Sequence, residues 1–241
     1  MLKYALITGS TRGIGRQIAE DFLKKEIFVI LNYSFSDQDA AAAARVLSRI
    51  SKKFAIVKSD LSSFESLEYF IGEVKKITQN LDYLVFNAGV TKRCGFEEIN
   101  IEDWMKIFNA NVNLPFFILQ GLNRMIRKNG RIIFIGSILG IYPHAVSIPY
   151  GVSKSCLEIM AKYLIKEFLP RKITVNVVAP GFVDTSWQKG KSRKQKIRIA
   201  GRIALKRFAD PREISSSCLH LLENEYINGQ TIIVDGGYDY E

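Results

Sequence analysis

The chain has 241 residues, and its apolar fraction of 47% is enough for the core of one large domain or two small ones. No apolar run reaches the roughly 18 residues of a membrane span, and the first residues lack the pattern of a signal peptide, so we expect a cytoplasmic protein without a membrane segment. The three cysteines are widely separated and odd in number, and there are only two histidines, so we expect neither a disulfide framework nor a metal site.

The net charge of +10 is concentrated in one segment. Residues 186–207 contain nine Lys or Arg and no Asp or Glu, so the rest of the chain has a net charge of only +1. A segment of this kind attracts phosphates nonspecifically. Because few aromatic residues are interleaved with the basic ones, nucleic acid is a disfavoured partner.

Short β-branched segments alternate with helix-period segments along the whole chain. Each predicted strand is almost continuously apolar, as expected of strands covered on both faces. Between strands, apolar residues recur at helical spacing, as Ile18 and Phe22 do, and Ser63 is a plausible N-cap. This alternation predicts an α/β fold, a single doubly wound Rossmann-type domain over 1–241 with a parallel sheet of about seven strands and helices on both faces. The predicted strands are 4–8, 28–33, 54–59, 81–86, 131–136, 173–179 and 230–235.

A glycine-rich loop follows the first predicted strand. In TGSTRGIG, Gly9, Gly13 and Gly15 have the spacing G-x-x-x-G-x-G and lie between a strand and a helix. Glycines let the backbone turn tightly and approach a pyrophosphate bound at the helix N-terminus. A tight turn without a ligand is the alternative, but the strand–loop–helix context favours dinucleotide binding.

The end of the second strand indicates which dinucleotide binds. An acidic residue there would bond the adenosine ribose 2′-hydroxyl of NAD. Here Asn32, Tyr33 and Ser34 are neutral, Asp37 comes only later, and Arg12 lies in the phosphate loop. A neutral strand end and a nearby cation suit a 2′-phosphate, so we expect NADP(H) to be preferred, with NAD(H) as the alternative if Arg12 is only solvated.

The segment PYGVSK, at 149–154, places Tyr150 and Lys154 four residues apart, on one face of a helix. A free tyrosine has a pKa of ~10 and is a poor base near pH 7. A nearby ammonium favours the phenolate and lowers that pKa. Because this spacing also arises by chance, its meaning depends on the motifs around it.

From Leu2 to Gly237 the chain resembles the short-chain dehydrogenase/reductase family. The TGSTRGIG loop resembles the family's cofactor loop, and the DL pair at 60–61 resembles the pair that contacts adenine. NAG at 87–89 resembles the motif after the fourth strand. PGFVDT at 180–185 resembles the segment around the nicotinamide. The order of these motifs identifies the chain as a member. The cofactor-binding residues that the resemblance implies are Gly9, Ser10, Thr11, Arg12, Gly13, Ile14, Gly15, Asn32, Tyr33, Asp60, Leu61, Asn87, Ala88, Gly89, Tyr150, Lys154, Pro180, Gly181, Val183 and Thr185.

The resemblance also implies four catalytic residues. Tyr150 would exchange a proton with the substrate, and Lys154 would lower the pKa of Tyr150 and hold the nicotinamide ribose. Ser137 would polarise the substrate oxygen, as an oxyanion stabiliser does, and Asn111 would anchor a water that links Lys154 to solvent. Each has a structural alternative, as a helix residue or a strand-end hydroxyl.

Within the family the chain is most similar to 3-oxoacyl-(acyl-carrier-protein) reductases, through ALITGSTRGIGRQIA, NYS and INGQTIIVDGG. This implies reduction of a 3-oxoacyl thioester on an acidic acyl carrier protein, in fatty acid biosynthesis. It also implies a homodimer or homotetramer that packs through helices near 102–127 and 150–169. The stretches NAGVTKRCGFEEI and YPHAVSIP depart from the family's usual sequence. In the family, both regions line the substrate pocket. A reductase or dehydrogenase of a free ketone, alcohol or sugar therefore stays open, with a cofactor-sensing scaffold as a non-enzymatic alternative.

The basic segment follows PGFVDT, where related reductases have the loop that folds over the substrate. We therefore expect 186–207 to be a basic substrate lid, with Gly190 and Gly201 as hinges. A solvated charged loop is the alternative.

Two further basic pairs are Arg127–Lys128 and Arg171–Lys172. In the carrier-protein reductases, basic residues at these places meet the acidic carrier. His144 is close in sequence to Tyr150 and could touch the substrate, although lone histidines are more often structural or exposed.

Overall fold

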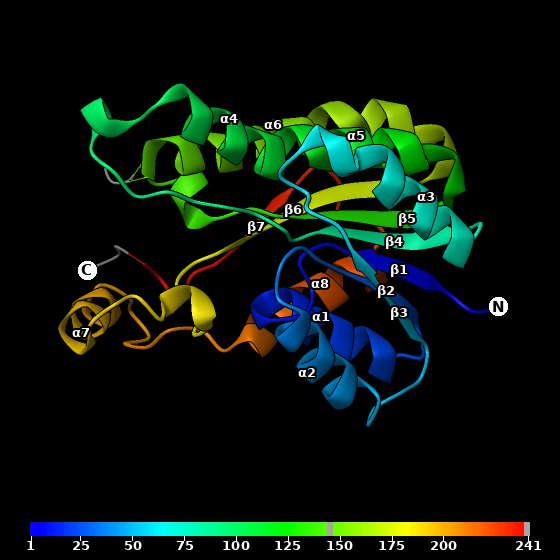
Figure 1. Cartoon of the computed structure of the whole chain (residues 1–241), viewed down its shortest axis with the longest axis horizontal. Coiled ribbons are helices and arrows are strands. Elements are labelled where there is room, and N and C mark those ends of the chain that lie inside the picture. The colour runs from blue at the N-terminus through cyan, green and yellow to red at the C-terminus, as the bar shows by residue number, and fades with distance from the viewer. Residues whose placement is uncertain (144–146, 239–241) are drawn as a thin grey trace.

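The computed structural model of the chain describes residues 1–143 and 147–238, and so excludes His144. Seven strands form one parallel sheet in the order β3-β2-β1-β4-β5-β6-β7 (Figure 1), which confirms the predicted fold class. The strands are β1 (Tyr4–Ile7), β2 (Phe28–Tyr33), β3 (Phe54–Lys58), β4 (Leu81–Phe86), β5 (Ile126–Ile135), β6 (Thr174–Pro180) and β7 (Thr231–Val234).

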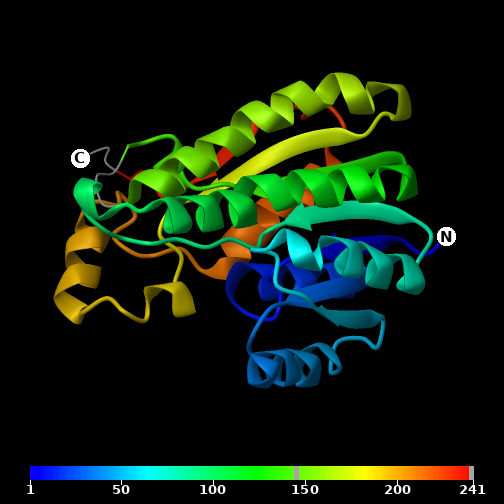
Figure 2. The same cartoon turned by 45° about the horizontal axis from the view of Figure 1, so that its top comes forward.

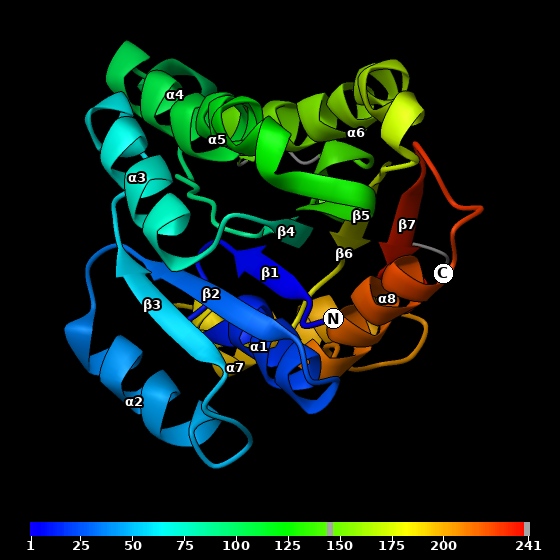
Figure 3. The ribbon, with the colours of Figure 1, turned by 90° about the vertical axis from the view of Figure 1, so that its right-hand side faces the viewer.

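Helices cover both faces of the sheet (Figure 3). One layer contains α1 (Gly13–Lys24), α2 (Asp37–Leu47) and α8 (Pro211–Glu223); the other contains α3 (Leu67–Ile77), α4 (Ile101–Phe108), α5 (Leu114–Leu122) and α6 (Ile148–Phe168). Successive strand residues enter opposite cores, since Leu6 packs in the α3–α5–α6 core while Ala5 and Ile7 pack in the α1–α2–α8 core. Both cores are dry and apolar, which explains the nearly continuous apolar strands.

The helix α7 (Arg193–Gly201) belongs to neither layer. In Figures 1 and 2 it lies beyond the sheet, on the side that the carboxyl ends of the strands face. None of its residues is buried. No helix in the described ranges is long and apolar enough to cross a bilayer.

The predicted element bounds differ from the structure in three places. β5 begins at Ile126 rather than at 131, because Ile126 pairs with Leu81 ahead of a register shift. Ser63 does act as an N-cap, but of the 3₁₀ turn Phe64–Ser66 that precedes α3. The helix expected over 102–127 is α4 and α5 joined by a π-helical turn, Asn109–Asn113.

The start of α1 is packed against the ends of β1 and β4 so closely that glycine is required. A Cβ at Gly15 would lie 2.5 Å from Asn87 Nδ2, 2.7 Å from the carbonyl oxygen of Gly9 and 2.9 Å from Ser10 Cα. Two of these three atoms are backbone atoms, so the contacts cannot be relieved by a side-chain rotation alone. The sequence motif therefore has a packing cause at this position as well as a binding one.

We expect Gly15→Ala to destabilise the fold, although alanine normally stabilises a helix relative to glycine. Overpacking of this kind costs about 1–3 kcal/mol. The matched control is Gly72→Ala in α3, where an added Cβ meets no atom within 4 Å, so the helix should gain about 0.5–1 kcal/mol. Urea unfolding of both variants measures the difference. The same sign of change in both variants would contradict the packing argument.

Candidate active site

A cavity of about 340 Å³ lies at the carboxyl ends of the strands. It is lined by residues that follow β1, β2, β3, β4, β5 and β6, which is where ligands bind in doubly wound sheets. Of the predicted site residues, Ser10, Gly15 and Asn111 lie behind its wall. The remaining ones line it: Gly9, Thr11, Arg12, Gly13, Ile14, Asn32, Tyr33, Asp60, Leu61, Asn87, Ala88, Gly89, Ser137, Tyr150, Lys154, Pro180, Gly181, Val183 and Thr185.

The glycine-rich loop fits a pyrophosphate. Gly9 and Gly13 have positive φ angles of 59° and 56°, which side chains disfavour. The N-cap of α1 is Arg12, whose side chain makes no capping bond, and the first turn has no acidic residue. The amide groups and positive dipole of this helix end are therefore left for an anionic ligand.

Asn32 and Ser10 have structural tasks. Asn32 is buried, its Oδ1 accepts from Gly9 N at 3.1 Å, and its Nδ2 donates to the Ser59 carbonyl at 3.0 Å. Ser10 Oγ donates to the Ile7 carbonyl at 2.7 Å and accepts from Asn32 N at 3.1 Å. These bonds tie the ends of β1, β2 and β3 together, so Asn32 contributes to the site by holding the loop.

At the adenosine end the polar side chains are paired with one another. Arg12 Nη1 lies 3.4 Å from Asp39 Oδ2, and both groups are exposed. Asp37 accepts from Tyr33 Oη at 2.6 Å and from Lys58 Nζ at 2.9 Å, and these bonds hold the pKa of the Asp37 carboxyl below its ordinary value. The cation Arg12 is thus held by a weak, exposed pair beside the neutral end of β2, and a phosphate could replace Asp39 there.

The wall of the cavity after β4 is held by side-chain bonds to the glycine-rich loop. Asn87 Nδ2 donates to the carbonyls of Thr8 and Gly9 at 3.0 and 2.8 Å, and Ala88 N donates to Thr8 Oγ1 at 3.0 Å. A Cβ at Gly89 would lie 3.1 Å from Asn111 Oδ1 and 3.5 Å from Lys154 Nζ. The NAG motif therefore fits between the glycine-rich loop and the predicted catalytic residues.

Asn111 lies in the π-helical turn between α4 and α5, a feature that often marks functional sites. Its Oδ1 accepts from Val90 N at 2.9 Å. Its Nδ2 donates to the Val90 carbonyl at 3.0 Å and to Ser153 Oγ at 2.9 Å. Ser153 in turn donates to the Tyr150 carbonyl at 2.7 Å. Both amide hydrogens of Asn111 are used, so its side chain connects the wall after β4 to the first turn of α6.

Tyr150, Lys154 and Ser137 meet at the floor of the cavity. Burial raises the pKa of Tyr150 to about 12, against a hydrogen bond with Ser137 that lowers it. Burial lowers the pKa of Lys154 to about 8. Lys154 Nζ donates to the Ile135 carbonyl at 2.7 Å and lies 5.7 Å from the Tyr150 ring centroid. Opposite pKa shifts in adjacent groups are typical of acid–base sites.

The segment after β6 closes the cavity on the other side. A Cβ at Gly181 would lie 2.7 Å from Asp235 Cα, so this turn needs glycine. Val183 forms a bridge with Ala209, and Thr185 caps the 3₁₀ turn Ser186–Gln188 by accepting from Trp187 N at 3.3 Å. The turn begins the basic segment and places its first residues on the cavity wall.

Several residues of the wall were missed by the sequence analysis as site residues, among them Arg93, Phe182, Trp187 and Gln188. The ring of Trp187 lies 6.3 Å from that of Tyr150. Gln188 is buried. Arg93 lies in the segment NAGVTKRCGFEEI and Phe182 in PGFVDT. No spacing rule indicates that these two side chains face the cavity, because their positions depend on the course of two loops.

The rest of the basic segment is attached through a small separate core. Ile203 is buried with Ile138 and Tyr238, and Ile199 and Phe208 pack against them. At Gly190 and Gly201 an added Cβ would meet no atom within 4 Å, so packing does not require glycine at either proposed hinge.

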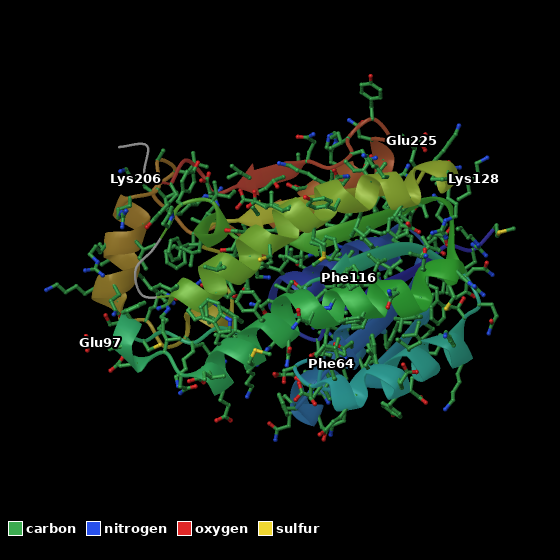
Figure 4. All side chains as sticks on the ribbon, turned by 90° about the horizontal axis from the view of Figure 1, so that it is seen from above. Phe64, Glu97, Phe116, Lys128, Lys206 and Glu225 are labelled. Carbon is green, nitrogen blue, oxygen red and sulfur yellow. The ribbon has the colours of Figure 1, made fainter. Side chains whose placement is uncertain are left out.

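The two other basic pairs lie elsewhere. Arg127 is at the start of β5, where it bonds Asp82, and Lys172 comes just before β6. Arg171 donates to the Asn123 and Ile126 carbonyls. In Figure 4, Lys128 and Lys206 mark opposite ends of the molecule. Within one chain, these pairs and the segment 186–207 therefore do not form one surface.

Comparisons with known proteins agree with this geometry. The family model described as enoyl-(acyl carrier protein) reductase matches residues 9–239. The chain is 34% identical to the 3-oxoacyl-(acyl-carrier-protein) reductase of Aquifex aeolicus, over 98% of this chain and 96% of that protein. It is 30% identical to glucose 1-dehydrogenase 2 of Bacillus subtilis, over 98% of this chain and 94% of that protein.

Solved structures agree as well. A short-chain dehydrogenase/reductase from Serratia marcescens superposes with a TM-score of 0.92 at 30% identity, covering 98% of both chains. A blue fluorescent protein from a metagenomic library, in complex with NADPH, also has a TM-score of 0.92, at 26% identity and with 99% and 98% covered.

Proposed function

Because this chain belongs to the short-chain dehydrogenase/reductase family of oxidoreductases, we propose that it is an NADPH-dependent carbonyl reductase. The observation that carries the proposal is the group of Tyr150, Lys154 and Ser137 at the floor of a cavity whose other end fits a dinucleotide. A cofactor-sensing scaffold would not require a buried lysine beside a half-buried tyrosine, because burying an ammonium costs several kcal/mol.

The chemistry that NADPH supplies when bound is a hydride for the carbonyl carbon. Tyr150, with a pKa of about 12, holds its proton at neutral pH and donates it to the carbonyl oxygen. Lys154, with a pKa of about 8, remains largely charged at pH 7, and its Nζ, 5.7 Å from the centroid of the Tyr150 ring, stabilises the phenolate that forms. Ser137 orients the carbonyl oxygen by a hydrogen bond. The proposed role of Asn111, which its bonds to Val90 and Ser153 hold in place, is to anchor a water that links Lys154 to solvent.

For the substrate, we propose a 3-oxoacyl thioester on an acyl carrier protein, in fatty acid biosynthesis. The Aquifex relative supports this, and so does the exposed basic helix α7 beside the cavity. An acidic carrier would be attracted to a segment with nine cations and no acid. A free small-molecule ketone, alcohol or sugar is the second candidate, favoured by the similarity to a glucose dehydrogenase.

We also propose that α4 and α6 pair with a second copy of this chain, to give a homodimer or a homotetramer. Their outer faces carry exposed apolar side chains, which soluble monomers rarely gather on neighbouring helices. These side chains are Ile101, Met105, Val152, Ile159 and Tyr163.

NADPH should be preferred over NADH in steady-state kinetics, because Arg12 lies beside a neutral strand end. Arg12→Ala should weaken the binding of NADPH by about tenfold, which corresponds to the loss of one charge-assisted bond. The binding of NADH should be nearly unchanged. Asp39→Asn should favour NADPH further, since it removes the carboxylate paired with Arg12. Equal or higher kcat/KM with NADH would contradict the assignment.

Tyr150→Phe should lower kcat by a factor of about 10²–10⁴, because it removes the acid. The fold and NADPH binding should persist, because the ring keeps its packing. The matched control is Tyr226→Phe, where the side chain is fully exposed and outside the cavity lining, and its kcat should be that of the wild type. Stopped-flow reduction of acetoacetyl thioester measures both. Retention of more than about a tenth of kcat in Tyr150→Phe would rule out its role as the acid.

A carrier-protein thioester should lose kcat/KM steeply as ionic strength rises, whereas a short neutral thioester should change little. Replacing Arg193, Lys194 and Lys196 together by Gln should impair only the carrier-bound substrate. A triple Gln variant at the exposed residues Arg49, Lys52 and Lys75 controls for net charge. If both substrates respond equally, or neither responds, the small-molecule reductase becomes the better account.

A further inference from the structure

Two cations from different segments lie on or next to the wall of the cavity: Arg93 lines it, and Lys191 contacts two of its lining residues. Arg93, in the loop after β4, is exposed and lines the cavity. Lys191, between the 3₁₀ turn Ser186–Gln188 and α7, is half-buried. Its Nζ donates to Gln188 Oε1 at 2.6 Å and lies 5.9 Å from the Phe182 ring centroid. Gln188 and Phe182 both line the cavity, so Lys191 is anchored to the same wall that Arg93 faces.

Neither cation is neutralised by an acidic side chain of the described residues. Over residues 1–143 and 147–238, no acidic side chain forms an ion pair with Arg93 or Lys191. The neighbouring Lys92, by contrast, is paired with Asp103. Burial, followed by repulsion from Arg93 and Lys196, lowers the pKa of Lys191 to about 8. Repulsion between unpaired cations beside a cavity is relieved when an anion binds between them.

The surroundings of this pair add positive potential. Lys191 immediately precedes Ser192, the N-cap of α7, and the first turn of α7 contains no acidic residue. The N-terminal end of a helix carries partial positive charge. The ring of Trp187, which also lines the cavity, lies 6.3 Å from that of Tyr150. The cavity therefore combines a phenol and an apolar ring with a nearby pair of cations.

We propose that Arg93 and Lys191 form a subsite for an oxyanion, a carboxylate or a phosphate, carried by the substrate at the end remote from its carbonyl. The planar guanidinium of Arg93 can hold two oxygens of one anion, and Lys191 supplies a point charge from the opposite segment. The substrate class is thus an amphiphilic ketone with an anionic end. This assignment rests on the proposed reductase function. The anion can belong to a free oxo acid or to the phosphate of a pantetheine thioester.

The test measures binding separately from turnover. Calorimetric titrations into the full chain saturated with NADP⁺ use two matched pairs of probes, pantetheine 4′-phosphate with pantetheine, and hexanoate with hexanamide. Within at least one pair the anionic member should bind about tenfold more tightly than the neutral one, the effect of one or two charge-assisted bonds. The pair with the larger ratio identifies the source of the anion. Arg93→Gln and Lys191→Gln should each abolish most of this ratio, and Lys191→Arg should retain it.

Lys52→Gln is the matched control, because it removes the same charge at an exposed position outside the cavity lining, and its ratio should equal that of the wild type. Equal affinities within both pairs, or equal losses in the Lys52 variant, would overturn the subsite. Reduction of acetoacetyl thioester by NADPH is assayed independently. If a neutral ketone is reduced but neither probe pair shows a preference for the anion, the proposed reductase function is supported and the proposed subsite is wrong. If the anion ratio depends on Arg93 and Lys191 but no ketone is reduced, the subsite stands and the reductase falls.

Discussion

All seven strands run in the same direction, and this constraint decides where the site can form. Parallel strands need crossovers on both faces, so the faces are covered by helices and only the two edges formed by strand ends stay open. The chain continues from β1 to β2 on one side and from β4 to β5 on the other, so the loops diverge between β1 and β4. The glycine-rich loop and the NAG segment, 87–89, flank that point. Every predicted catalytic residue lies in a segment that follows a strand at this same edge.

Burial determines the chemistry of the residues at this edge. Lys154 and Tyr150 are each disfavoured in their charged forms by burial, so the pKa of the ammonium falls while that of the phenol rises. Hydrogen bonds to the main chain hold two of the predicted catalytic side chains in position. Lys154 donates to the Ile135 carbonyl, and Asn111 donates to the Val90 carbonyl. Because the acceptors belong to a strand end and a packed loop, these bonds fix the geometry of the site. The chain thus holds an acid and a cation ready at the cavity floor.

The substrate side is built differently. The helix α7 has no buried residue, and the segment around it depends on a small cluster centred on Ile203 and Tyr238 that is separate from both main cores. Few buried apolar contacts mean a low free energy of local opening. A region of this kind can change its side chains at little cost to the fold. The glycine-rich end of the cavity is thus packed into a main core, whereas the segment around α7 is attached through a separate small cluster.

The sequence by itself determined the fold class, the strand bounds within a few residues at six of the seven strands, and the residues around the dinucleotide end. These features depend on local rules, namely apolar periodicity, glycine conformation and the spacing of Tyr150 and Lys154, which a linear chain displays. Only the tertiary structure decided the rest. It showed that the side chains of Asn32 and Asn111 hold loops in place. It also showed that Arg93 lines the cavity and that Lys191, 98 positions later in the chain, donates to Gln188 of the same wall. The physical reason is that such contacts depend on how loops from distant segments meet at the sheet edge, and no local pattern in the sequence encodes that approach.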